Sequence, residues 1–210
     1  MARTPRKPAG SPHFALIAIV MAGLLIVAAS GLFVYALHEN PKGAAGTLLG
    51  ASIGGPFHLV DQNGKPFSDA DLKGKWHLVF FGYTHCPDVC PTTLNEISLA
   101  LDKLHKSERG NVGIVFISVD PERDTPAVLK SYVASFDAPI IALSGSDAAV
   151  AQAAKDYHVY YAKHPRADGG YDMDHSAVIY VMDPQGRFTA TFTPDTTADA
   201  MVTRLQKLLS

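Results

Sequence analysis

The sequence predicts an α/β protein, with a central mixed sheet flanked by helices, behind a single N-terminal transmembrane helix. Two observations predict this architecture. Apolar residues fill the segment from Phe14 to Leu37 without a charge, and later runs of β-branched and aromatic residues alternate with runs of helical periodicity. The chain of 210 residues has room for one globular domain and an additional segment.

The segment 14–37 is long enough to cross a bilayer. At a rise of about 1.5 Å per residue it would extend roughly 36 Å, against a hydrocarbon core of about 30 Å. A cleaved signal peptide is the alternative, since Ala28 to Ser30 could serve as a cleavage site, but the apolar run continues beyond it. Arg3, Arg6 and Lys7 precede the span, and such a positive flank stays in the cytoplasm. We therefore expect a single-pass protein of the bacterial inner membrane with its C-terminal domain in the periplasm.

This organisation divides the chain into four parts. Residues 1–13 are predicted to be a basic cytoplasmic tail, 14–37 the anchor, 38–55 a linker rich in Gly, Ala and Pro, and 56–210 the globular domain. The formal net charge is −2 at pH 7, and no basic stripe interleaves with aromatic residues. Nucleic acid is therefore not expected as a partner.

The order of the expected elements in the globular domain indicates its topology. They are a hairpin over 57–67 with an Asn-Gly turn, a strand over 76–83, a helix over 91–106, a strand over 112–119, a helix over 125–136, a strand over 140–143, a helix over 147–157, a hairpin of strands 176–182 and 187–192, and a helix over 195–209. Strand–helix–strand, then a hairpin and a terminal helix, is the order of the thioredoxin-like fold, here with added elements. The strand–helix–strand unit requires a parallel pair of strands.

The only two cysteines, Cys86 and Cys90, lie four residues apart after the buried strand. A residue before proline is pushed toward extended conformations, and a proline follows each cysteine. We therefore expect the next helix to begin at about Pro91, with Cys90 at its cap. A helix N-terminus lowers the pKa of a nearby thiol, which favours the thiolate. Two such thiols can form a disulfide, bind a soft metal, or do both.

A metal site at this loop would need a further donor, and His175 is the leading candidate. It stands directly before the predicted strand Ser176–Met182. In thioredoxin-like folds this position faces the cysteine loop, and redox enzymes of the fold place a cis-proline there. This chain has a histidine and no proline nearby, which favours metal binding. Zinc usually takes four protein ligands, whereas copper(I) accepts two or three.

Three neighbours of these residues are weaker candidates for the site. His85 adjoins Cys86, but adjacent side chains seldom converge on one ion. Met173 could supply a thioether, although packing is its commoner role. Asp174 could orient the His175 ring, or simply begin a turn.

A second polar loop, Ser118 to Pro126, follows the next buried strand. The carboxyl ends of parallel strands share one edge of a sheet, so this loop is expected near the cysteines. It admits two interpretations. It is either a capped loop that starts a helix, with Asp124 as the cap, or a charged rim on which another protein docks.

Three segments together resemble the Sco/SenC family of membrane-anchored copper proteins. They are Phe81 to Thr92 around the cysteines, Ser118 to Pro126, and Asp174 to Ser176 before a strand that ends at Asp183 to Gly186. They occur in the order found in the family and span nearly all of the globular domain. The cysteine motif is specific, and the two Asp-Pro motifs support it.

The resemblance implies a metallochaperone rather than an enzyme. Such a protein would bind one copper ion through Cys86, Cys90 and His175, and would help to assemble the binuclear copper site of cytochrome c oxidase. The implied partners are the copper-site subunit of the oxidase, other copper chaperones and a thiol reductant.

Two other functions for the cysteine pair remain open. A thiol–disulfide oxidoreductase or redox sensor would use Cys86 and Cys90 and would not need His175. The missing proline before Ser176 argues against a standard thioredoxin. A thiol peroxidase ranks lower, because the Pro-x-x-x-Thr-x-x-Cys arrangement of peroxiredoxins is absent.

Overall fold

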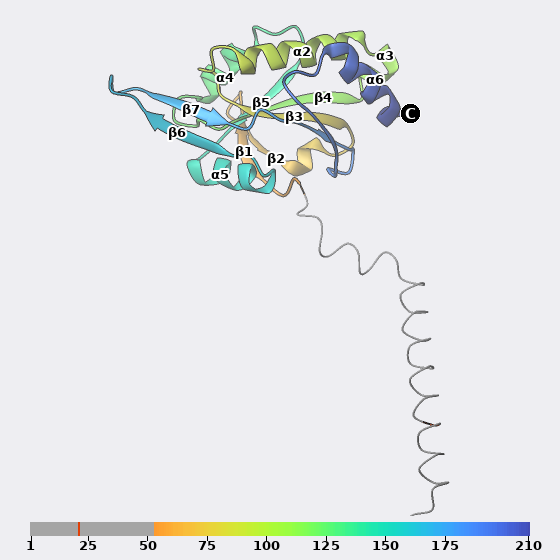
Figure 1. Ribbon diagram of the computed structural model, residues 1–210, viewed down its shortest axis with the longest axis horizontal. Helices are drawn as coiled ribbons and strands as arrows, with labels where there is room; N and C mark the ends of the chain where they lie inside the picture. Colours follow the sequence, from red (N-terminus) through yellow and green to blue (C-terminus); the bar gives the residue numbers. More distant parts are fainter. Residues whose placement is uncertain (1–20, 22–52) are drawn as a thin grey trace, which may run out of the picture. The chain divides into compact units, whose positions relative to one another are not determined.

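The computed structural model describes Met21 and residues 53–210. Its elements in chain order are β1 (His58–Asp61), β2 (Pro66–Ser68), η1 (Asp69–Leu72), β3 (Trp76–Gly82), α2 (Val89–Lys103), α3 (Lys106–Arg109), β4 (Val112–Ser118), α4 (Pro126–Val133), β5 (Ile140–Ser144), α5 (Asp147–Asp156), β6 (Tyr161–Pro165), β7 (Tyr171–His175), β8 (Ile179–Met182), β9 (Phe188–Phe192) and α6 (Ala198–Leu209). Figure 1 shows α2 and α6 together on one side of the sheet and α5 on the other.

The main sheet has seven strands in the order β2-β1-β5-β4-β3-β8-β9. β3 and β4 are parallel and pair over their full length, from Trp76 with Val112 to Gly82 with Ser118. β8 joins β3 antiparallel on the other side, and β9 follows it. The predicted mixed sheet flanked by helices is therefore confirmed, and β4-β3-β8-β9 with α2 and α6 forms its thioredoxin-like core.

The centre of the sheet lies in the hydrophobic core. Leu78 to Phe81 on β3 and Ile114 to Ile117 on β4 have no exposed surface. Strands that are covered on both faces read as continuous apolar runs, which is why the sequence identified these two clearly. The Asn-Gly hairpin is also confirmed, because Gly64 has a φ of 78° in the turn between β1 and β2.

An additional hairpin of β6 and β7 was not predicted. It forms a two-stranded sheet of its own, with Tyr161 opposite His175 and Pro165 opposite Tyr171. It projects beyond the main sheet in Figure 1. These strands are short and largely exposed, so their alternation of polar and apolar residues is too weak to identify them from the sequence. The prediction that a strand begins at Ser176 was wrong, because β7 ends at His175 and β8 begins at Ile179.

The other boundary corrections concern three helices. α4 ends at Val133 rather than at 136, and α6 begins at Ala198 rather than at 195. The helix predicted over 91–106 is α2, which ends at Lys103, followed by the separate short helix α3. The cap of α4 is Thr125, whose side chain accepts a hydrogen bond from the Val128 N–H at 3.4 Å. Asp124 is not a cap, because its carboxylate already accepts hydrogen bonds from Thr84 and Ser118.

The predicted tail 1–13, the anchor 14–37 and most of the linker 38–55 lie outside the described residues, apart from Met21 and residues 53–55. Within the residues that are described, no helix is both long enough and apolar enough to cross a membrane.

Candidate metal centre

The cysteine loop joins the end of β3 to the start of α2. The backbone N–H of Cys90 donates to Cys86 Sγ at 3.4 Å, so the loop curls over the helix N-terminus. Cys90 is buried, Cys86 is partly exposed, and both are free thiols. The expectation that the helix begins at Pro91 was wrong, because α2 begins at Val89 and Cys90 lies in its first turn. A proline is tolerated there, since the first N–H groups of a helix have no partner within it.

His175 lies close to the cysteines in the structure, although it is distant from them in the sequence. Its Nε2 lies 3.5 Å from Cys90 Sγ, although 85 residues separate the two. The ring packs edge-on against Tyr83, with the ring centroids 5.5 Å apart, and against Phe80 at 6.2 Å. His175 therefore lies beside the cysteine loop and in contact with Cys90.

The donors are close, but they do not yet surround a common point. Among the described residues, no group of three or more His, Cys, Asp or Glu side chains is spaced to hold a metal ion as it stands. Side chains would therefore have to move for the three donors to close around an ion. An open hollow of about 300 Å³, lined by Cys86, Val89, Met173 and His175 among others, gives room for that change.

The two thiols differ in charge. The Cys90 thiol donates to Cys86, and this bond lowers the pKa of Cys86 to about 5, with help from the backbone N–H groups of Cys90 and Asp88. The same bond, together with burial, raises the pKa of Cys90. At neutral pH the negative charge therefore resides on the more exposed sulfur, Cys86.

His175 is held in the form that can bind a metal. Burial lowers the pKa of its imidazole, against a smaller opposing effect of Cys86, so the ring is neutral at pH 7. Two sulfur donors and a neutral imidazole suit a soft ion such as copper(I) or zinc. The donor set thus fits the metal that the sequence predicted, and the hydrophobic packing around the ring restricts its rotation.

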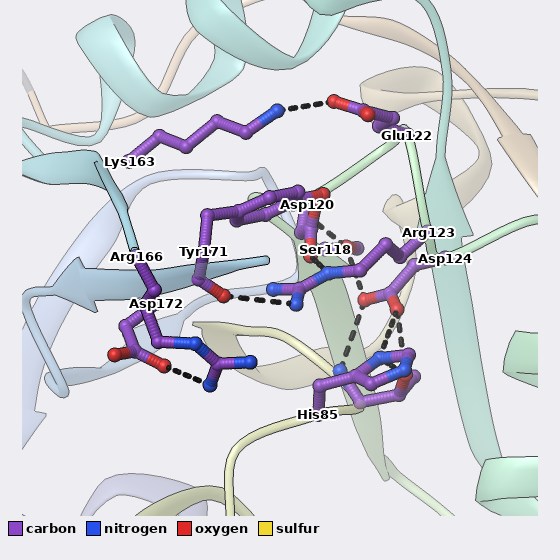
Figure 2. A network of polar contacts seen from close by, with 11 residues as sticks. His85, Ser118, Asp120, Glu122, Arg123, Asp124, Lys163, Arg166, Tyr171 and Asp172 are labelled. Atoms are coloured by element: carbon purple, nitrogen blue, oxygen red, sulfur yellow. Dashed lines mark hydrogen bonds and ion pairs between the residues drawn. The ribbon is translucent and has the colours of Figure 1, made fainter. Parts of the chain in front are cut away.

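Of the three weaker candidates, Met173 and Asp174 line the same hollow as Cys86 and His175, whereas His85 makes its contacts elsewhere. His85 is half exposed, and its Nδ1 lies 3.2 Å from Thr84 Oγ1 and 3.9 Å from Asp124 (Figure 2). Met173 is buried in the core. Asp174 is exposed and pairs with His164 at 2.9 Å, so it does not orient the His175 ring.

The polar loop after β4 supports the cysteine loop. Asp124 is fully buried, and its carboxylate accepts hydrogen bonds from Thr84 N at 3.0 Å, Thr84 Oγ1 at 2.6 Å and Ser118 Oγ at 2.6 Å. Figure 2 shows this carboxylate beside the cysteine loop. The sequence placed the two loops at one edge correctly, but it did not identify Asp124 as their connection. A buried carboxylate is recognised only once its partners are known.

Comparison with known proteins identifies the family. The SCO1/SenC family model matches residues 45–210. The chain belongs to the SCO1/SenC family. It is 41% identical over 151 residues to the mitochondrial SCO1 homolog 1 of Arabidopsis thaliana. These aligned residues make up 72% of this chain and 45% of that protein. The chain thus spans less than half the length of this relative.

Solved structures of SCO1/SenC proteins resemble the chain closely. ScoI of Bradyrhizobium japonicum, described with copper bound, is 51% identical, with a TM-score of 0.69 over 74% of this chain and 99% of that one. BsSco is described as a member of the Sco family of cytochrome c oxidase assembly proteins in which a disulfide switch was identified. It is 26% identical, with a TM-score of 0.60 over 76% of this chain and 95% of that one.

Replacing Gly82 should disturb this SCO1/SenC site directly. A Cβ on Gly82 would lie 2.8 Å from Phe116 Cε2 and 2.9 Å from Cys90 Sγ. We expect Gly82→Ala to lower the free energy of unfolding by about 1–3 kcal/mol, because the core would be overpacked. Gly110→Ala is the control, since nothing lies within 4 Å of its Cβ position. Equal denaturant midpoints for the two variants would contradict this account.

The unequal thiols predict selective alkylation. Thiolates react and thiols do not, so Cys86, with its pKa of about 5, should be alkylated by iodoacetamide at pH 6, while Cys90 stays unmodified. As the pH falls through about 5, the rate at Cys86 should drop. The unfolded protein is the control, where both thiols should titrate near about 8.5. Mass spectrometry of the modified peptides measures this, and a folded-state rate that drops below pH 8 would contradict it.

Proposed function

We propose that the chain is a metallochaperone that holds one copper ion through Cys86, Cys90 and His175. The observation that carries the proposal is the contact of His175 Nε2 with Cys90 Sγ, 3.5 Å apart, beside the Cys86 thiolate. A purely redox pair has no need of a neutral imidazole within reach of its buried sulfur. The copper-bound ScoI of Bradyrhizobium japonicum, at 51% identity, supports the choice of metal.

The arrangement of the donors suits delivery more than permanent storage. Copper is the cargo, and binding it releases the proton that Cys90 retains in the free protein. Cys86 lies at the open hollow, so the thiolate of a partner can approach the ion from that side. Exchange of one sulfur ligand at a time would then pass the ion on without releasing it to solvent.

We propose further that the recipient is the copper-site subunit of cytochrome c oxidase. The description of BsSco as one of the cytochrome c oxidase assembly proteins supports this. Other copper chaperones would load the site, and a thiol reductant would keep Cys86 and Cys90 reduced. The apolar segment 14–37 and the basic residues before it support an inner-membrane anchor with the globular domain in the periplasm.

A second function is favoured by the unequal thiols. A partly exposed Cys86 thiolate next to a buried, protonated Cys90 is the arrangement of an attacking and a resolving thiol. Cys86 would attack a partner disulfide and release one partner thiolate. Cys90 would then attack the mixed disulfide, leaving a Cys86–Cys90 disulfide and a second partner thiol. This reaction would prepare the cysteines of the oxidase and would not use His175.

Copper analysis of histidine variants separates the two functions. Reduced protein should bind about one copper, and His175→Ala should bind it at least about tenfold more weakly. Removal of a residue that only orients a metal ligand already lowers metal affinity by about tenfold, and removal of the ligand itself should lower it at least as much. His164→Ala is the matched control, since His164 is a half-exposed histidine on the neighbouring strand β6. Competition with a chromogenic copper(I) chelator measures the affinities. Equal affinities for parent and His175→Ala would exclude the three-ligand site and leave the reductase.

Fractionation of cells tests the proposed anchor. The full chain should stay in the membrane pellet after carbonate extraction, and its C-terminal domain should be digested by protease in spheroplasts. The double variant Leu25→Arg, Val27→Arg should be released, because each central arginine costs about 2.5–3.5 kcal/mol of insertion. A parent protein that carbonate releases would contradict the anchor.

A further inference from the structure

The position of His175 is not set by the main sheet. β7 pairs only with β6, in a two-stranded sheet of its own. An isolated hairpin is marginally stable in water, so side-chain contacts must hold it against the domain. The contacts that do so determine where the imidazole stands relative to the two sulfurs.

Arg123 makes the main polar contacts between this hairpin and the domain. Its Nη1 donates to the Tyr171 carbonyl at 3.2 Å, and its guanidinium carbon lies 3.8 Å from the centroid of the Tyr171 ring. Its Nε pairs with the carboxylate of Asp120, which also accepts a hydrogen bond from the Tyr171 hydroxyl at 2.7 Å. Figure 2 shows the Arg123 guanidinium extending to the Tyr171 carbonyl, with Asp120 close to both residues. Tyr171 is thus held at its backbone, ring and hydroxyl, four residues before His175.

The same loop also holds the cysteines. The Asp120 N–H donates to Ser118 Oγ at 3.0 Å, and Ser118 Oγ donates to Asp124 at 2.6 Å. Asp124 in turn accepts the two hydrogen bonds of Thr84, two residues before Cys86. A continuous chain of contacts therefore connects the strand of His175 to the loop of Cys86.

A second path runs through aromatic rings. The Arg123 guanidinium carbon lies 5.9 Å from the centroid of the Tyr83 ring. Tyr83 packs edge-on against the His175 ring, 5.5 Å from it. Contacts thus connect Arg123 to His175 both along the backbone of β7 and through the ring of Tyr83.

Burial distinguishes this connection from the surface ion pairs of the hairpin. The Asp120 side chain is 3% exposed and that of Arg123 is 24% exposed, whereas Arg166 and Asp172 are 49% and 64% exposed. Exposed pairs are worth little because water competes for them. A planar guanidinium can pair with a carboxylate, donate to a carbonyl and stack on a ring at once, which a lysine cannot do.

We propose that Arg123 is a positioning residue that sets His175 against the two cysteine sulfurs, through Tyr171, Asp120 and Tyr83. The inference rests on the proposed copper site, and it adds to that site a residue that touches neither the ion nor its ligands.

The first test is copper affinity. Arg123→Met should bind copper about tenfold more weakly, as is usual when a residue that orients a ligand is removed. Arg123→Lys should not restore binding, because it keeps the charge but loses the planar fork. Arg166→Met is the matched control, the same substitution in the turn of the same hairpin, and should bind as the parent does. Parent-like affinity of Arg123→Met overturns the proposal.

A double-mutant cycle tests whether Arg123 acts through His175. If it does, Arg123→Met should cause less than about a twofold further loss of affinity in a His175→Ala background. A full tenfold loss in that background would show that Arg123 acts on the cysteines or on general stability, which overturns the proposal. If Arg123→Met does not fold, Tyr171→Phe takes its place in the same cycle, with an expected loss of about threefold, because it removes only the hydroxyl.

Hydrogen exchange of the metal-free protein gives a readout that does not depend on copper. In Arg123→Met, the amides of β7 should exchange at least about tenfold faster, while those of β3 and β4 stay protected. Unchanged exchange in β7 overturns the proposal. Faster exchange in β7 together with a parent protein that binds no copper would support the positioning role and refute the copper site, so the two failures are distinguishable.

Discussion

The parallel pairing of β3 with β4 is the constraint on which the site depends. Because the two strands run in full register, from Trp76 with Val112 to Gly82 with Ser118, their carboxyl ends reach the same edge of the sheet together. The cysteine loop leaves one end and the polar loop after β4 leaves the other. Asp124 can therefore bind Thr84 across a short gap and hold the cysteine loop in place. Without this pairing the two loops would not lie side by side, and the contacts between them would be lost.

The same packing gives the two proposed chemistries of the cysteines, metal binding and disulfide exchange, a common basis. The bond between the two thiols, together with the burial of Cys90, raises the pKa of Cys90, and the same bond stabilises the Cys86 thiolate. That thiolate is the form that binds a soft ion, and it is also the form that attacks a disulfide. His175 is the feature that separates the two chemistries, because only the metal needs it. Its neutral state follows from burial against Phe80 and Tyr83.

Much of the fold, and the position of His175 beside the cysteine loop, could be predicted from the sequence, for physical reasons that differ from residue to residue. The buried strands β3 and β4 were evident as continuous apolar runs, and the two cysteines stood out as the only ones in the chain. The start of α2 was placed two residues late, at Pro91, because the bias before proline is a preference and the first turn of a helix tolerates it. The hairpin β6–β7 was missed, since short exposed strands carry little periodicity.

The sequence by itself determined the chemistry that is available: two thiols in one loop, a histidine in reach of them by topology, and an apolar segment before the domain. Composition and local preferences are properties of neighbouring residues, so they can be read along the chain. Only the tertiary structure decided which thiol carries the charge, that Asp124 is a buried connector rather than a helix cap, and that Arg123 lies between Tyr171 and Asp120. Burial and hydrogen bonding between distant segments decide these properties, and they exist only once the strands have paired.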